Sequence, residues 1–204
     1  TDIAVILTEG ILKDIVGGND CSIVQVYVES PLIWGIHVAA NSKYNALADL
    51  ENTKIAISRY GSGSHLMAYV NAQNQNWNTE TLQFEIVNTI DGAVEALTKG
   101  TADYFMWERF MTKPLVDKGI FRRVADCPTP WPCFVIAVRN SVLENDKATI
   151  ARLLKVINDV SASFKQRPGI EQILANRYQL QSADVEQWLA VTEWSQSNLS
   201  EPMV

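Results

Sequence analysis

The sequence predicts an α/β protein built as two lobes. Short apolar or β-branched runs alternate with helix-like segments from the start of the chain to about residue 139. This order is typical of βαβ units around a mostly parallel sheet. After residue 139 only helical patterns remain, with no strand candidate. A βα-rich centre and a helical tail therefore favour two lobes, with the tail packing back on the earliest strands.

Each strand candidate is a short run rich in apolar, β-branched or aromatic residues. The first, Ile-Ala-Val-Ile-Leu, is continuously apolar, whereas "SIVQVYV" alternates as a half-buried strand does. Five further runs have the same composition. The candidates are residues 3–7, 22–28, 54–58, 84–87, 103–107, 121–125 and 134–138.

The predicted helices lie between these runs and beyond them. Glycines end two of them, since residues 9–16 precede Gly17 and residues 91–99 precede Gly100. A third helix is predicted over residues 64–75. In the tail, apolar residues from 150 to 164 recur on one helical face, and Pro168-Gly169 then breaks the chain. Two more helices follow, the second with Ser182 as its expected N-cap.

The composition excludes several classes of protein. The chain has 204 residues, of which 47% are hydrophobic and 20% charged, as in ordinary globular proteins. Its net charge of −6 argues against nucleic-acid binding, which needs a clustered basic surface. The longest apolar run, residues 31–40, is too short to span a bilayer, so we expect no direct membrane insertion.

Cysteine and histidine are too few for a metal site or a disulfide framework. Cys21, Cys127 and Cys133 are an odd set with no zinc spacing. The stiff segment "PTPWP" separates the last two, so we expect buried thiols, although a disulfide between them stays open. His37 and His65 are the only histidines. We therefore expect no metal ion and no cofactor.

The loop "RYGSGSH" separates a predicted strand from a predicted helix. In this arrangement backbone N–H groups and the helix dipole face one point, which suits an anionic group. The glycines allow close approach, and Arg59 adds a positive charge nearby. The loop is neither a P-loop nor a nucleophile elbow. The alternative is a capped helix start, with Ser62 or Ser64 as N-cap and no ligand.

Three other strand candidates also have polar residues at their carboxyl ends: Thr8-Glu9 and Glu29-Ser30 follow two of them, and Trp107-Glu108 end the third. In open α/β sheets, ligands bind beyond the carboxyl ends of strands. A tryptophan beside an acceptor suits a flat organic molecule, although a core tryptophan with a solvated glutamate is the alternative. We expect no catalytic residue. The residues expected to contact a ligand are Thr8, Glu9, Ser30, Arg59, Tyr60, Gly61, Ser62, Gly63, Ser64, His65, Trp107 and Glu108.

Five strings together resemble one known family over nearly the whole chain. They are "TEG", "YVESPLIWGIH", "ISRYGSGSHLMAYV", "FMWERF" and "PWP". The chain resembles type II periplasmic binding proteins of the NMT1/THI5-like group, related to the sulfonate- and thiamine-precursor-binding proteins of ABC transporters.

The resemblance implies two three-layer αβα lobes joined by two crossover strands, near residues 32–38 and 135–139. The first lobe would comprise residues 1–33 and 135–204, and the second residues 34–134. Family members begin with a further βαβα segment before the strand that matches residues 3–7. We therefore expect a first lobe that lacks this segment, with reduced stability or association through an exposed strand edge.

The resemblance further implies a non-enzymatic solute-binding protein of an ABC-type uptake system, partnered by a permease and located in the periplasm or otherwise outside the cytoplasm. It would close by a hinge on a small anionic or heteroaromatic ligand, such as a sulfonate or a pyrimidine. The loop around Ser62 would hold an anionic group, Trp107 would stack and Glu108 would accept hydrogen bonds. The alternatives are a thiamine-pyrimidine biosynthesis enzyme that uses His65, an effector-binding sensor domain, and a cytoplasmic location.

Overall fold

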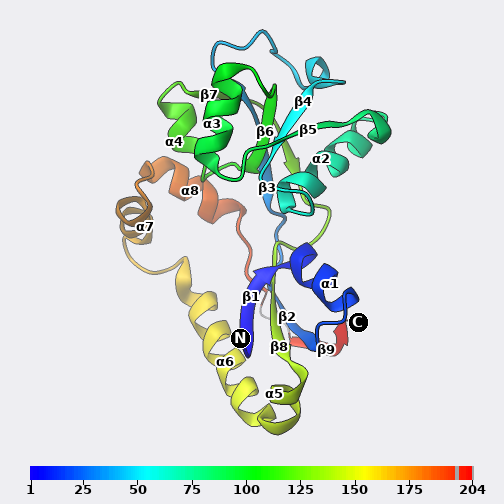
Figure 1. Cartoon of the computed structure of the whole chain (residues 1–204). Coiled ribbons are helices and arrows are strands. Elements are labelled where there is room, and N and C mark those ends of the chain that lie inside the picture. Colours follow the sequence, from blue (N-terminus) through cyan, green and yellow to red (C-terminus); the bar gives the residue numbers. More distant parts are fainter. Residues whose placement is uncertain (196–197, 204) are drawn as a thin grey trace. The chain divides into compact units, whose positions relative to one another are not determined.

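The computed structural model describes residues 1–195 and 198–203, and the chain divides into two compact units (Figure 1). Unit 1 comprises Thr1–Pro31 and Pro130–Val204, and unit 2 comprises Leu32–Thr129. Each unit contains one β-sheet with helices packed on it. No helix in the described part of the chain is long and apolar enough to cross a membrane.

Unit 1 is built on a four-stranded sheet in which every described strand pair is antiparallel. In spatial order its strands are β1 (Ile3–Leu7), β8 (Phe134–Arg139), β2 (Cys21–Val28) and β9 (Asn198–Met203). The prediction of a mostly parallel sheet is therefore wrong for this unit. The reason is that β8, which returns from unit 2, lies between β1 and β2 and runs against both.

Helices cover both faces of this sheet. On one face, α1 (Thr8–Val16) packs Ile11 against Ile23 and Val135. On the other face, α6 (Lys147–Phe164) packs Ile150 and Leu154 against β8. The remaining helices are α5 (Asn140–Asn145), α7 (Ile170–Tyr178) and α8 (Ser182–Val191), the last two packed on each other.

Two expectations for the tail are wrong. The tail is not purely helical, because β9 extends the sheet beside β2. Ser182 is the first residue of α8 rather than its N-cap, and its hydroxyl donates to Gln172 instead. For the thiols the sequence prediction holds, since Cys127 and Cys133 are both buried and are not joined by a disulfide.

Unit 2 contains a mixed five-stranded sheet. Its strands, in spatial order, are β5 (Gln83–Ile86), β4 (Lys54–Ile57), β6 (Tyr104–Glu108), β3 (Ile33–Ala39) and β7 (Phe121–Pro128). The first three are mutually parallel, whereas β3 runs antiparallel to both of its neighbours. The helices of this unit are α2 (Gly63–Asn74), α3 (Ile90–Lys99) and α4 (Lys113–Asp117), with 3₁₀ turns at Leu47–Leu50 and Thr79–Thr81.

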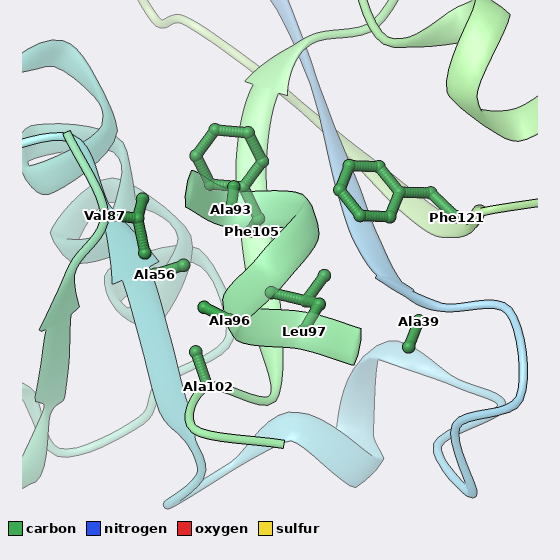
Figure 2. Close-up of a cluster of buried hydrophobic side chains, with 9 residues drawn as sticks. All are labelled: Ala39, Ala56, Val87, Ala93, Ala96, Leu97, Ala102, Phe105 and Phe121. Carbon is green, nitrogen blue, oxygen red and sulfur yellow. The ribbon is translucent and has the colours of Figure 1, made fainter. Parts of the chain in front are cut away.

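The core between α3 and the sheet of unit 2 depends on small residues. Figure 2 shows Ala93, Ala96 and Leu97 of α3 among Ala56, Val87, Phe105 and Phe121. The helix approaches so closely that a Cβ atom at Gly92 would lie 2.0 Å from the carbonyl oxygen of Val87. Such dense packing holds α3, and with it the ends of β5 and β6, in a fixed position.

Candidate ligand-binding surfaces

In unit 2, the strands bring several predicted site residues to one edge of the sheet. Because β4, β5 and β6 are parallel, their carboxyl ends lie at the same edge. The register places Trp34, at the start of β3, opposite Glu108 at the end of β6. We call this edge, with the loop 59–65, Trp34, Trp107 and Glu108, the strand-end surface of unit 2.

The serines of the loop 59–65 are bonded to the loop itself. The Oγ of Ser62 caps α2 by accepting from the backbone N–H of His65 at 3.3 Å. The Oγ of Ser64 accepts from the N–H of Ser58 at 2.9 Å and lies 3.1 Å from the Oγ of Ser62. Both side chains are buried. The hydroxyls therefore fix the helix start, as the capped-helix alternative requires, while Arg59 and Tyr60 stay exposed.

His65 lies in an aromatic cluster. Its ring makes edge contacts with Tyr60, Tyr69 and Phe84, at centroid distances between 4.8 and 5.3 Å. Its Nδ1 accepts a hydrogen bond from the backbone N–H of Gly61 at 3.1 Å. With Nδ1 as acceptor, the neutral ring carries its proton on Nε2. His65 therefore helps to fix the loop through its ring contacts and through Nδ1.

Trp107 and Glu108 lie on opposite faces of β6, since they are consecutive strand residues. The Trp107 ring stacks on Phe105 at 5.3 Å and meets Trp34 edge-on at 5.9 Å. Oε2 of Glu108 accepts from the N–H of Met111 at 2.8 Å. Burial raises the pKa of Glu108. The hydrogen bonds from neighbouring backbone N–H groups act in the other direction and lower it. Both side chains remain half-buried rather than fully enclosed.

The other predicted site residues lie at one edge of the sheet of unit 1. Phe134, the first residue of β8, pairs with Leu7 of β1 and with Val28 of β2. The segment before β8 therefore meets the ends of both strands. The Oγ1 of Thr8 donates to the carbonyl oxygen of Pro132 at 2.6 Å, and the Oγ of Ser30 accepts from the N–H of Glu193 at 3.0 Å.

Trp131 adds an aromatic ring to this edge. Its Nε1–H donates to Oε2 of Glu9 at 2.9 Å. We call Thr8, Glu9, Ser30 and Trp131 the strand-end surface of unit 1. Trp131 was not among the predicted ligand contacts, and its place between Pro130 and Pro132, just before a strand candidate, is the sequence signal that could have indicated it. Trp34, also not among the predicted ligand contacts, is buried and contacts Trp107.

A separate hollow of about 230 Å³ lies at the opposite edge of the sheet of unit 2. It is lined by residues such as Ala39, Tyr44 and Asp103, and by none of the predicted site residues. There the Asp103 carboxylate accepts hydrogen bonds from the Tyr44 hydroxyl at 3.0 Å and from the N–H of Lys54 at 2.8 Å. Over residues 1–195 and 198–203, no three His, Cys, Asp or Glu side chains are grouped so that they could hold a metal ion.

Comparison with solved structures identifies the fold. The protein CA3427 of Candida albicans superposes with a TM-score of 0.83 and 23% identity, over 96% of this chain and 65% of its own. It is described as having the generic periplasmic binding protein fold. This chain has the periplasmic binding protein fold. A sequence model of the Ca3427-like periplasmic binding proteins matches residues 34–127.

Two sulfonate-binding proteins also have similar structures. The alkanesulfonate-binding protein SsuA of Xanthomonas axonopodis pv. citri, bound to MOPS, has a TM-score of 0.77 and 18% identity over 95% of this chain and 68% of its own. The aliphatic sulphonate binding protein SsuA of Escherichia coli has a TM-score of 0.73 and 21% identity, with coverage of 95% and 68%. No curated protein sequence matches the chain.

These comparisons confirm the α/β fold class and the resemblance to periplasmic binding proteins. The chain spans 65% of the length of CA3427 and 68% of the length of the two SsuA proteins. At these sequence identities the similarity establishes the fold, and function has to be argued from the residues themselves.

Proposed function

We propose that this protein binds a small organic molecule through its strand-end surfaces, as the solute-binding component of an ABC-type uptake system. The periplasmic binding protein fold supports the general role. Two proteins with similar structures are named as sulfonate-binding proteins, one of them bound to MOPS. The proposal includes a permease as partner, a location outside the cytoplasm and no catalytic turnover.

One observation carries this proposal: each unit has a tryptophan beside a glutamate at the ends of its strands. In unit 1, Trp131 donates to Glu9. In unit 2, Trp107 and Glu108 end β6, with Trp34 against Trp107. Aromatic faces next to a few fixed acceptors are typical of sites for flat organic ligands. In unit 1, a heteroaromatic ligand with N–H donors would use both features, because the Trp131 ring and the Glu9 carboxylate adjoin each other. In unit 2, Trp107 and Glu108 face opposite sides of β6 and would contact different groups of a ligand.

The loop 59–65 supports a further role for an anionic group. Its serine hydroxyls are bonded internally, so Arg59 and the amino end of α2 would provide the attraction. Arg59 is exposed, whereas Arg109 at the same edge forms an ion pair with Asp126 at 3.2 Å. We therefore assign Arg59, rather than Ser62 or Ser64, the principal contact with an anion.

A thermal-shift screen tests the proposal. The panel would contain aliphatic sulfonates, including MOPS, together with aminopyrimidines. A ligand at a hundred times its Kd should stabilise the folded protein by about 2.7 kcal/mol. Calorimetry on the responding ligand would then compare the wild type with Trp107→Ala and Trp131→Ala. We expect both changes to weaken binding, since a lost aromatic stack costs about 0.5–1.5 kcal/mol beyond its buried area.

Trp77→Ala is the matched control for these two variants. Trp77 follows the carboxyl end of α2, whereas the loop 59–65 precedes its amino end, so about 18 Å of helix separates them. We expect its affinity to equal that of the wild type. A ligand bound equally well by Trp107→Ala and Trp131→Ala would show that the strand-end surfaces are not the binding site.

A further inference from the structure

Four residues other than glycine have a positive φ in the part of the chain that the structure describes. They are Asn52, Asn76, Asn88 and Gln179. A side chain is strained in this region of φ, although asparagine tolerates it better than most residues do. Such strain persists where a local motif requires it, or where it belongs to a functional site.

Local motifs account for three of the four. Asn76 directly follows the C-cap of α2, and its N–H donates to the carbonyl oxygen of Gln73 at 3.1 Å, as in a Schellman helix end. Gln179 ends α7 in the same conformation. Asn52 is the third residue of the turn 50–53, whose ends are joined by a 3.2 Å N–H···O=C bond. The second residue of that turn has φ −60° and ψ 135°, so it is a type II turn, which requires a positive φ at its third residue.

Asn88 has no such motif. It follows β5 and is the central residue of a three-residue turn, in which the N–H of Thr89 donates to the carbonyl oxygen of Val87 at 2.6 Å. A γ-turn whose central residue has a positive φ, here 59°, is the rare and strained form. Glycine would relieve the strain, because it has no Cβ. The asparagine side chain therefore costs stability at this position.

Asn88 adjoins the loop 59–65. Because β4 and β5 are parallel, the residue lies at the same edge of the sheet as that loop. Its backbone N–H donates to the carbonyl oxygen of Ser58 at 3.1 Å, directly before Arg59. Its side chain is exposed and makes no hydrogen bond with any residue in 1–195 or 198–203. Two amide N–H donors are therefore available close to the start of the loop.

We infer that the side-chain amide of Asn88 is a second contact for the anionic group that Arg59 attracts. The inference rests on the proposed function and adds a residue that sets how tightly unit 2 holds an oxyanion. The amide would donate to one oxygen of the anionic group, and the guanidinium to another. Strained residues recur at ligand contacts, where a fixed side chain is needed more than stability, and this explains an asparagine where glycine would fit better.

The test compares Asn88→Gly and Asn88→Asp with the wild type, in the full 204-residue chain and with MOPS as the probe. Glycine removes the amide and accepts the positive φ. We therefore expect Asn88→Gly to melt at or above the wild-type temperature, yet to bind MOPS about tenfold more weakly or worse. Aspartate has nearly the same shape as asparagine but carries a negative charge and cannot donate. We expect Asn88→Asp to bind MOPS more weakly still, as measured by calorimetry.

Asn76→Gly and Asn76→Asp are matched controls. Asn76 is also exposed, has a φ of 57°, and lies beyond the opposite end of α2, about 18 Å of helix away from the loop 59–65. Glycine is favoured at this helix-end position, so Asn76→Gly should keep its stability as well. We expect both controls to bind MOPS as tightly as the wild type does.

Two results would overturn the inference while the proposed function stands. One is a MOPS affinity that falls in Trp107→Ala but is unchanged in both Asn88 variants. The other is a protein that binds an aminopyrimidine but not MOPS. A lower melting temperature of Asn88→Gly would also overturn the inference, because the side chain would then be structural. A wild type that binds no compound of the screen would remove both the inference and the proposed function.

Discussion

The indole N–H of Trp131 donates a 2.9 Å hydrogen bond to the carboxylate of Glu9, which is 122 residues away in the sequence. The bond ties the segment before β8 to the first turn of α1. The second carboxylate oxygen of Glu9 is buried and has no hydrogen-bond partner within the described residues. The pair therefore both stabilises unit 1 and leaves an acceptor at its strand-end surface.

The first prediction concerns the strength of this bond. A double-mutant cycle with Glu9→Ala and Trp131→Phe should give a coupling energy of about 1–2 kcal/mol, because one partner is charged and both are half-buried. Urea denaturation of the wild type, the two single variants and the double variant measures it. Additive effects of the two changes would mean that the bond contributes nothing to stability.

The second prediction is a pH dependence of stability from His37. Its ring is fully buried in β3, with Nε2 2.9 Å from the Oγ1 of Thr112. Burial lowers the pKa of His37 to about 4, and the charge of Arg123 acts in the same direction. In the unfolded chain the pKa is about 6.5, so the unfolded state binds more protons between these values.

The free energy of unfolding should therefore fall as the pH is lowered from about 6.5 to about 4, by about 3 kcal/mol from this residue alone. Carboxylates titrate in the lower part of this range as well. His37→Gln keeps a side-chain amide near Thr112 and cannot titrate, so the difference between wild type and variant isolates the histidine. Parallel stability curves for the two proteins over this pH range would contradict the prediction.

The third prediction compares two glycines that both lie in helices. A Cβ at Gly92 would lie 2.0 Å from the carbonyl oxygen of Val87, whereas a Cβ at Gly10 of α1 meets nothing within 4 Å. Gly92→Ala should push α3 from the sheet and destabilise the protein by about 1–3 kcal/mol. Gly10→Ala should stabilise it by about 0.5–1 kcal/mol, because alanine is the better helix former.

Thermal unfolding of both variants gives the comparison directly. Since the chemical change is identical, a difference in sign can come only from the surroundings of each glycine. If Gly92→Ala melted at or above the wild-type temperature, the close approach of α3 to the end of β5 would be wrong.

Local sequence patterns predicted the elements well but not their pairing. The apolar run 3–7 coincides with β1, and the change from strand to loop to helix around Ser62 is found as expected. The position of β8 between β1 and β2 depends on contacts more than a hundred residues apart, which no local pattern contains. The strand β9 was missed because "NLSEPM" is polar and contains a proline, so its pairing with β2 overrides a poor strand propensity.

The candidate site was predictable to the same degree. Residues next to strand ends, such as Glu9 and Glu108, could be named because the carboxyl end of a strand can be read from the sequence. The pairing of Glu9 with Trp131 could not, since it needs the register of β8. The burial of the hydroxyls of Ser62 and Ser64 was also beyond local reasoning, because the same motif serves an anion site and a helix cap.

The last prediction separates these two roles at Ser62. Its Oγ accepts from the N–H of His65, so Ser62→Ala should lose the N-cap and about 0.5–2 kcal/mol of stability. Asn and Asp are both good N-caps of nearly equal size, so Ser62→Asn and Ser62→Asp should each retain more stability than Ser62→Ala.

The Asn and Asp variants differ in charge alone. If the loop holds an anionic group beside Arg59, a sulfonate that binds the wild type should bind Ser62→Asp more weakly than Ser62→Asn, by about tenfold or more. Urea denaturation measures the first effect and calorimetry the second. Equal sulfonate affinities for the Asn and Asp variants would leave Ser62 as a helix cap and remove the loop from the binding site.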